Sequence, residues 1–312
     1  MEALTAAGRL IAYPGFLFTV ALGMLASWVD RKVTARVQWR VGPPLLQPLY
    51  DVVKLLGKET IVPADGLRWL FLAAPAFALA TSTVAATLIW RSQMAPGTTF
   101  VGDVIVALYL LTGPAVALVV GAFASRNPLA SVGGSREMKL VLSYELPLLL
   151  CILVAVIKTG SLSLGAMHTW QVANGAVATS PSGILALIVA VMCVQAKLGL
   201  VPFDMAEAET EIMGGALIEY SGPPLGLFKL TRFVMLTALP LLVACTLLGG
   251  VRFDAGPVGF LLGLGKVVVL WVVATLIRNT NPRVRVDQAL WFFWGPMTII
   301  AAAAVALGML GH

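Results

Sequence analysis

Long uninterrupted runs of apolar residues, separated by short polar segments, dominate this sequence. Crossing a hydrocarbon core of about 30 Å takes about 20 apolar residues in an α-helix. The strands of a membrane barrel are about 10 residues long and alternate in polarity, so these runs exclude a barrel. We therefore expect an all-α polytopic membrane protein, organised as one membrane domain over residues 1–312. Eight transmembrane helices are predicted, at residues 10–29, 69–90, 103–124, 139–158, 183–203, 226–248, 257–277 and 288–309.

Residues 44–58 show a different pattern, in which apolar and polar positions alternate at helical spacing. This pattern predicts a short amphipathic helix at the membrane interface, inside the first loop, residues 30–68. Two interpretations stay open: a surface anchor, or a helix that packs on a partner or roofs a cavity. The apolar face would hold Leu45, Leu49, Val52, Val53 and Leu56, and the polar face Gln47, Asp51, Lys54 and Lys58.

Composition supports the membrane assignment. Hydrophobic residues make up 59% of the 312 residues and charged residues only 12%, and the mean hydropathy is +0.92. Soluble domains carry about 25% charged residues, so this chain has too few charges to cover a water-facing surface. A water-soluble enzyme, a disordered protein and a secreted disulfide scaffold are excluded. The first apolar segment runs directly into Asp30-Arg31-Lys32 and lacks a small-residue cleavage site, which is unlike a cleavable signal peptide.

The distribution of Lys and Arg predicts the orientation. By the positive-inside rule, the loops after the first, third, fifth and seventh spans face the cytoplasm and both termini face outward. The same rule accounts for the net charge of +6, so no nucleic acid partner is expected. The loops assigned to the cytoplasm contain Arg31, Lys32, Arg36, Arg40, Lys54, Lys58, Arg68, Arg126, Arg136, Lys139, Arg278, Arg283 and Arg285; the outer loops contain only Arg91, Lys158 and Arg252, with Arg9 at the start.

The acidic cytoplasmic loop, residues 204–222, holds one third of the acids of the chain. If the segment is helical, Asp204, Glu207 and Glu211 share one face and Glu209 points away. Glu219 closes the segment. Like charges this close raise one another's pKa, which suits groups that exchange protons. A solvated acidic loop that binds a basic partner is the alternative.

Three charged residues inside predicted spans stand out, together with one just before the fourth span and one at the start of the third. Glu145 lies about six residues inside the fourth span, where a carboxylate is costly and is usually paired, protonated or functional. Glu137 precedes it by eight residues and lies roughly in line with it. Lys197 lies near the cytoplasmic end of its span and could snorkel, whereas Lys266 lies deep in the seventh. Asp103 is expected to cap the third span.

Cysteine and histidine argue against a redox centre in this chain. Cys151, Cys193 and Cys245 each lie alone in an apolar run, without metal-ligand spacing. Only His168 and His312 are present, which disfavours a haem held by two helices. We therefore expect no cofactor and no metal in this chain.

Several motifs resemble subunit 1 of respiratory complex I, in order and over almost the whole chain. They are Asp30-Arg31-Lys32, Arg36-x-Gln38-x-Arg40-x-Gly42-Pro43, Leu46-Gln47-Pro48, Asp51-x-x-Lys54-Leu55, Lys58-Glu59, Ser143-Tyr144-Glu145, Pro202-Phe203-Asp204-Met205-x-Glu207-x-Glu209-x-Glu211, Glu219-Tyr220 and Pro282-Arg283-x-Arg285-x-Asp287-Gln288, with Trp294 after it.

That family has a quinone-reducing branch, complex I, and a branch of energy-converting [NiFe] hydrogenases, which includes formate hydrogenlyase and the related membrane-bound sulfane reductases. The direct run Gly42-Pro43-Pro44-Leu45-Leu46-Gln47-Pro48 lacks an insertion that complex I carries near its quinone tunnel. Ser135-Arg136-Glu137 and Glu219-Tyr220-Ser221-Gly222 also look like the hydrogenase branch. The segment 282–288 is closer to complex I. The resemblance therefore favours the hydrogenase branch, with a quinone-reducing NADH or ferredoxin dehydrogenase as the alternative.

The resemblance implies a membrane foot and coupling subunit for a soluble redox arm. The arm would contain a large subunit with the [NiFe] centre and a small subunit with [4Fe-4S] clusters, and antiporter-like membrane subunits would pump H⁺ or Na⁺. By resemblance, the interface with the arm includes Arg31, Arg36, Arg40, Arg283, Arg285 and Asp287. Arg36 and Arg40, four residues apart, would share a helical face. The implied relay consists of Glu137, Glu145, Asp204, Glu207, Glu209, Glu211, Glu219 and Lys197.

Two functions outside this scheme stay open. A stand-alone secondary transporter is compatible with eight spans and buried charges, although no internal repeat with paired broken helices is evident. A passive scaffold without any part in ion movement is the other.

Overall fold

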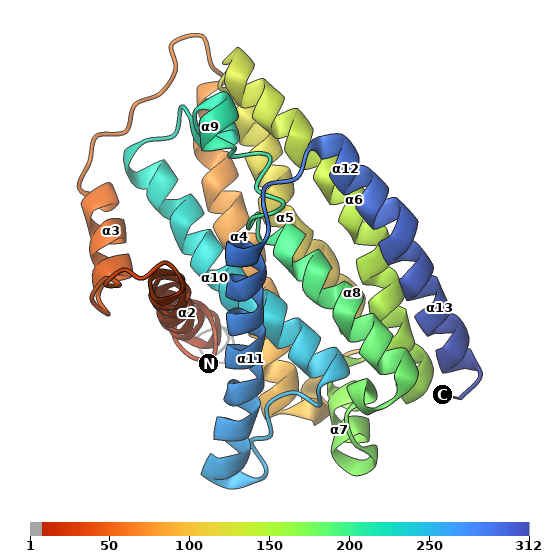
Figure 1. The fold of residues 1–312 in the computed structure, drawn as a ribbon. Coiled ribbons are helices and arrows are strands. Elements are labelled where there is room, and N and C mark those ends of the chain that lie inside the picture. Colours follow the sequence, from red (N-terminus) through yellow and green to blue (C-terminus); the bar gives the residue numbers. More distant parts are fainter. Residues whose placement is uncertain (1–7, 312) are drawn as a thin grey trace.

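The computed structural model describes residues 8–311, and this part of the chain is helical without any strand (Figure 1). The α-helices are α2 (Phe16–Val37), α3 (Gln47–Leu56), α4 (Arg68–Met94), α5 (Asp103–Ala124), α6 (Pro128–Thr159), α7 (Leu164–Asn174), α8 (Pro181–Lys197), α9 (Glu209–Ile212), α10 (Gly222–Leu247), α11 (Gly256–Thr280), α12 (Val286–Phe292) and α13 (Thr298–Met309).

The predicted all-α multi-pass membrane protein is confirmed. Within residues 8–311, seven helical segments are long and apolar enough to cross a membrane: α2, α4, α5, α6, α10, α11 and the continuous segment from α12 to α13. The eighth predicted span corresponds to α8, whose 17 residues lie at the lower limit for a crossing helix. A π-helical turn, Phe293–Met297, joins α12 to α13.

The helices differ from the predicted spans mainly at their ends. Helix α2 continues through Asp30-Arg31-Lys32 to Val37, and α6 begins at Pro128 rather than near residue 139. Backbone hydrogen bonds do not require apolar side chains, so a helix can continue past the hydrocarbon. Helix α8 ends early, at Lys197, and the left-handed conformation of Gly199 follows it.

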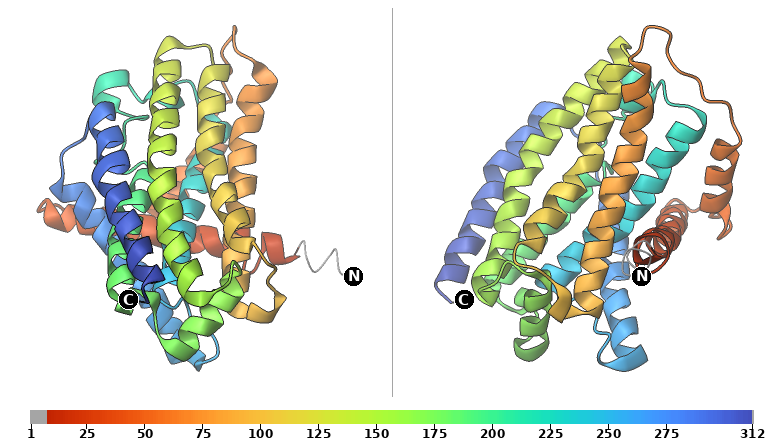
Figure 2. Two further views of the ribbon diagram at one scale, coloured as in Figure 1. Left: turned by 90° about the vertical axis from the view of Figure 1, so that its right-hand side faces the viewer. Right: turned by 180° about the vertical axis from the view of Figure 1, so that it is seen from behind.

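Helix α10 is the centre of the bundle and packs against α2, α4, α8 and α11. Helix α2 lies across the bundle rather than along it, as the two views in Figure 2 show. The crossing depends on Gly23, because a Cβ atom there would overlap the backbone of Phe233 in α10. The largest fully buried side chains include Trp90, Tyr144 and Phe71.

Side-chain caps fix several helix starts. The side chain of Asn127 accepts a hydrogen bond from the backbone of Leu129, and Pro128 occupies the first turn of α6. Ser163 and Ser180 cap α7 and α8 in the same way. A polar oxygen before the first turn and an early proline both favour a helix start, because the first N–H groups lack partners inside the helix.

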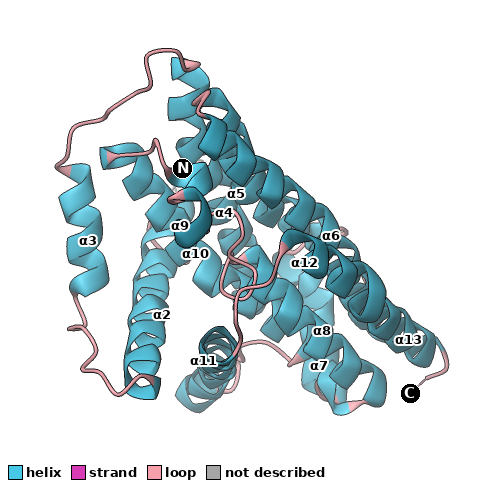
Figure 3. Ribbon diagram, turned by 45° about the horizontal axis from the view of Figure 1, so that its top comes forward, coloured by secondary structure: helices cyan, strands magenta, loops and turns pink. Residues whose placement is uncertain are grey.

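The predicted amphipathic helix is present as α3, beside the bundle (Figures 1 and 3). It packs against α10 and α2, with Val52 and Leu55 buried. Leu49, Val53 and Leu56 remain exposed although they are apolar. The apolar face of α3 is therefore broader than its contact with the bundle.

The end of the bundle that carries α9 and the start of α6 is called the upper end below, as it lies at the top of Figure 1. The opposite, lower end carries α7. Helices α5 and α6 meet at the upper end through residues 125–127, and the linker of residues 281–285 rises toward it from α11 to α12. The segment between α8 and α10 also lies there, so the sequence motifs from distant parts of the chain gather at this end.

Candidate functional site

A cavity of about 360 Å³ lies beneath the segment between α8 and α10, and we call it the charged chamber. Its apolar walls include Leu111, Leu118, Phe203 and Met235, from α5, α10 and the segment after α8. The charged side chains that line it belong to four predicted relay acids, the predicted relay lysine and two further cations: Glu137, Asp204, Glu207, Glu209, Lys197, Lys229 and Arg232.

Three of the five acids in the 204–222 loop, Asp204, Glu207 and Glu211, each pair with an arginine from another segment. The only α-helical turn in residues 204–221 is Glu209–Ile212, so the expected shared face of Asp204, Glu207 and Glu211 does not form. Asp204 receives a bidentate pair of hydrogen bonds from Arg283, one of them from Nε at 2.8 Å. An Arg232 N–H lies 3.2 Å from Glu207.

The remaining two pairs fasten the loop to α6. Arg136 donates to Glu211 at 2.6 Å, and the Asn127 amide donates to Glu219 at 2.5 Å. The hydrogen bond and the charge of Arg136 hold the pKa of Glu211 below its ordinary value, despite a small opposing effect of desolvation. The spacing predicted that neighbouring acids raise the pKa of Glu211. This prediction is wrong for Glu211, because its nearest charged neighbour is the guanidinium of Arg136 in α6.

Lys197 lies inside the bundle instead of extending to the interface. Its side chain is 1% exposed, and its ammonium donates to Glu145 at 3.2 Å and to Thr112 at 2.9 Å. The Thr112 hydroxyl lies 3.0 Å from the other carboxylate oxygen of Glu145. This triad joins α5, α6 and α8, and Lys197 connects it to the chamber. Snorkelling is thereby excluded for Lys197.

Glu137 and Tyr144 lie between the loop pairs and the triad along α6. Glu137 is 7% exposed, lines the chamber and makes no hydrogen bond or ion pair within the described residues. Tyr144 is fully buried, and the Lys197 ammonium lies 5.6 Å from the centre of its ring. The Tyr144 hydroxyl is buried without a hydrogen-bond partner in this part of the chain. Buried polar groups without a protein partner are typical positions for ordered water.

Tyr220 fixes the end of the acidic loop. Its ring stacks on Phe71 with a 4.1 Å centroid separation, and its hydroxyl donates to the Phe71 carbonyl oxygen at 3.0 Å. The hydroxyl lies over Gly121 of α5, where a Cβ atom would overlap it. The carboxylate of Glu219, the preceding residue, is thereby held near Asn127.

The first loop contributes pairs of its own. Arg31 donates to Asp51 of α3 at 3.0 Å, and Arg278 of α11 donates to Asp30 at 2.6 Å. Burial raises the pKa of Asp51, but hydrogen bonds from Arg31 and Gln47 outweigh it, so the net pKa lies below the ordinary value. These pairs fix the C-terminal half of α2 to its neighbours.

The prediction that Arg36 and Arg40 share a helical face is wrong. Helix α2 ends at Val37, and Trp39 adopts a left-handed conformation, so Arg40 lies outside the helix. Neither arginine forms an ion pair within the described residues. Trp39 between them is 97% exposed.

Two other predicted roles need correction or refinement. Asp103 does not cap its own helix; its carboxylate accepts from the backbone N–H of Leu164, at the start of α7. Lys266 donates to the carbonyl oxygens of Leu248 and Gly250 at the lower end. In both cases the partner lies in another segment, and spacing alone does not reveal it.

Residues 11–309 match a family profile described as NADH dehydrogenase. The chain belongs to the NADH dehydrogenase subunit 1 family, the subunit 1 family of respiratory complex I. The resemblance found in the sequence motifs is therefore confirmed. This membership makes the chain a membrane subunit of a complex I-like oxidoreductase.

Individual relatives agree with this membership. The chain is 34% identical to an NADH-quinone oxidoreductase subunit of Anoxybacillus flavithermus, over 94% of this chain and 89% of the relative. It is 33% identical to the corresponding subunit of Thermomicrobium roseum, over 95% and 93%. Among solved structures, it matches a chain of the membrane-bound sulfane sulfur reductase, an archaeal respiratory membrane complex, with a TM-score of 0.88, 27% identity and coverage of 98% and 99%.

Sequence reasoning missed three members of the site: Thr112, Lys229 and Arg232. The two cations lie in the apolar run of α10, where an ionisable residue is rare and marks a functional position. That signal was present in the sequence. Thr112 gives no such signal, because a threonine in a span usually bonds to its own helix, as this one also does through the Leu108 carbonyl oxygen.

Proposed function

We propose that the chain anchors a soluble redox arm and couples it, through the charged chamber, to ion-pumping membrane subunits. The observation that carries the proposal is the set of charged groups that line one chamber from the upper end into the bundle. It begins at Asp204 and Glu207, passes Glu137 at the chamber wall and reaches the triad of Lys197 with Glu145.

The pairing pattern supports a relay rather than a static acidic patch. Protonating Glu207 would leave the Arg232 charge without its counterion, and this change alters the field on the remaining chamber groups. Glu145 is 20% exposed at the far end, next to α5. We assign that exposed edge to contact with an antiporter-like subunit.

The upper end is assigned to the cytoplasmic side, with both termini outside. Arg136 and Arg283, both expected in cytoplasmic loops, form their ion pairs with the acidic loop at this end. We assign the turn after α2 to contact with the redox arm. Arg36 and Arg40 are exposed there and form no ion pair within the described residues, and Trp39 between them is also exposed. Arg31 and Arg283 would support the interface by fixing α3 and the acidic loop.

Substitution of Glu145 and of Glu211 by Gln tests the relay. Both variants are expected to assemble, because Gln keeps the size and an acceptor oxygen for Lys197 or Arg136. We expect ion translocation per turnover to fall, or turnover to stop, in sealed membrane vesicles that contain the whole complex. Asp254→Asn, at an exposed position outside the chamber, is the matched control. Normal pumping stoichiometry in both Gln variants would exclude the relay.

For the partner, we propose the hydrogenase branch, in which the large subunit contains a [NiFe] centre and the small subunit [4Fe-4S] clusters. The continuous run from Gly42 to Pro48 supports this branch. The names of the two bacterial relatives support the alternative, a quinone-reducing complex. Purification of the intact complex separates the two: a large subunit with two Cys-x-x-Cys pairs and hydrogen evolution supports the first, and quinone-dependent turnover sensitive to piericidin-type inhibitors supports the second.

A further inference from the structure

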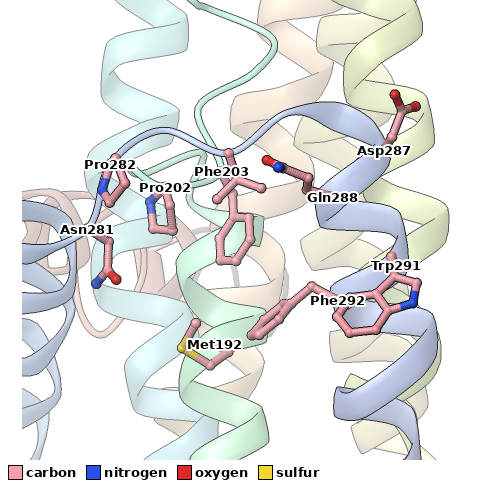
Figure 4. A pocket seen from close by; sticks show the side chains of 10 residues that line it. Met192, Pro202, Phe203, Asn281, Pro282, Asp287, Gln288, Trp291 and Phe292 are labelled. Carbon is pink, nitrogen blue, oxygen red and sulfur yellow. The ribbon is translucent and has the colours of Figure 1, made fainter.

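A group of buried polar side chains lies at the lower end of the bundle, outside the charged chamber. Gln93 of α4 and His168 and Gln171 of α7 are each at most 1% exposed. By contrast, a cavity of about 590 Å³ between α8, α12 and the 281–285 linker is mainly apolar, with aromatic rings around it (Figure 4). Buried polar chemistry outside the chamber is therefore found around α7 rather than in this cavity.

Side chains from three helices hold the turn between α10 and α11, residues 248–251. Gln171 of α7 accepts a hydrogen bond from a backbone N–H of the turn at 2.8 Å, and Gln93 of α4 accepts from another at 2.9 Å. Lys266 of α11 donates to a backbone carbonyl oxygen of the turn at 2.6 Å. Gln171 also donates to the last turn of α10. These bonds satisfy backbone groups where α10 ends, and they fasten α7 to the bundle.

His168 lies against the same turn without any hydrogen bond. It is 1% exposed, and neither ring nitrogen has a partner within the described residues. A Cβ atom at Gly250 of the turn would lie 2.9 Å from its Nδ1 and overlap the side-chain oxygen of Gln93. Buried polar groups normally have a partner. Packing alone would be served better by an apolar side chain, and the property that distinguishes histidine here is its titration near neutral pH.

The surroundings of His168 disfavour its charged form. Desolvation by burial lowers the pKa of His168 below its ordinary value; Asp254 opposes this effect, and Arg252 and Lys266 add to it. The imidazole is therefore neutral while α7 is docked. The other titratable groups at the adjoining ends of the helices around α7 are Arg91 of α4, Asp103 of α5, Lys158 of α6 and Cys245 of α10.

We propose that His168 is a pH-sensitive latch, which holds α7 against the lower end of the bundle while its ring is neutral. Protonation would create two N–H donors without acceptors and add a positive charge near Arg252 and Lys266. The protonated form therefore favours release of α7 into water, which breaks the Gln171 bonds and uncovers Cys245. The orientation assigned under the proposed function places the lower end outside, and on that assignment the latch responds to acid in the outer compartment.

The expected effect has a defined sign and limit. A base whose pKa is lower in the docked state stabilises docking fully above its ordinary pKa, and this stabilisation is lost as pH falls. From the ordinary histidine pKa of about 6.5 down to the lowered value, the equilibrium for release of α7 should rise about tenfold for each pH unit. Below the lowered value it should change no further.

Hydrogen exchange of residues 164–174 and alkylation of Cys245 measure the release in the intact complex. Each rate is compared between the parent and His168→Leu at the same pH, because the ratio cancels the intrinsic pH dependence of exchange and of thiol reactivity. We expect the ratio to be constant above about pH 6.5 and to rise up to about tenfold per unit below it. Thr169→Ala, at an exposed position of α7, should behave like the parent. Neither measurement depends on ion pumping or on the orientation of the chain.

A ratio that stays the same at every pH would overturn the proposal, and equal acid release in His168→Leu would assign it to the Asp103 carboxylate at the start of α7 instead. Arg252→Gln gives an independent test, because it removes one of the two cations near His168. The pKa of docked His168 should then move toward its ordinary value, so that acid release reaches its limit at a higher pH and a smaller total. An unchanged limit would overturn the charge repulsion on which the latch depends.

Discussion

Removal of the Glu145 charge tests the buried triad most directly. At a separation of 3.2 Å, two unit charges attract by about 5 kcal/mol at an effective dielectric constant of about 20. The Glu145→Leu variant would leave the Lys197 ammonium, 1% exposed, without its counterion. Breaking one side of a buried pair costs about 3–5 kcal/mol, since the remaining charge is not compensated. Thr112 still accepts a hydrogen bond from the ammonium, so we expect a loss of stability at the lower end of this range.

The assay is thermal unfolding of the purified complex, followed for this chain, in four proteins: the parent, Glu145→Leu, Lys197→Met and the double variant. A loss of about 3 kcal/mol corresponds to a Tm decrease of roughly 5 °C for a chain of this size. The double variant should regain most of this loss, because replacing both charges by apolar groups removes the uncompensated ion. If Glu145→Leu lowers Tm equally with and without the lysine, the two charges are not coupled and the reasoning is refuted.

Three other predictions concern the packing and the loop. Gly121→Ala should release the Tyr220 hydroxyl from α4 and lower stability by about 1–3 kcal/mol, seen as a lower Tm; an unchanged Tm would show that α5 can move aside. Gly23→Ala should push α2 away from α10 and lower stability by a similar amount. Faster protease cleavage within residues 30–46 would show this loss of packing, and parent-like cleavage would contradict it. The pKa of Glu211 is lowered, so its pair with Arg136 stabilises the loop fully above the ordinary carboxyl pKa and is lost as pH falls through the lowered value. Hydrogen exchange of residues 209–212 should rise at that acidic pH in the parent and at a higher pH in Arg136→Gln; the same midpoint in both would contradict the pairing.

The sequence predicted the transmembrane architecture because span length depends on composition within one segment. It located α3 because apolar residues recur there at helical spacing within one segment, so no partner from another segment is needed to see the pattern. The chamber depends instead on partners from other segments: Asp204 and Arg283 are 79 residues apart in the chain. Spacing along the 204–222 loop therefore predicted mutual repulsion where the structure has ion pairs.

Local conformation explains the other errors. The shared face of Arg36 and Arg40 assumed a helix through residue 40, but the backbone turns at Trp39. The π-helical turn of Phe293–Met297 also has no clear sequence marker apart from Pro296. The motif resemblance identified most of the charged residues at the site, whereas their pairing required the coordinates.

The ion pairs between distant segments also set an order for biogenesis. Asp30, in the first crossing helix, pairs with Arg278, 248 residues later, and Asp204 pairs with Arg283, 79 residues later. Until α11 and the linker after it have emerged from the ribosome, at least one of the two carboxylates lacks its arginine. A chain truncated before residue 278 would thus present bare acids to the insertion machinery, and only the nearly complete polypeptide can neutralise them.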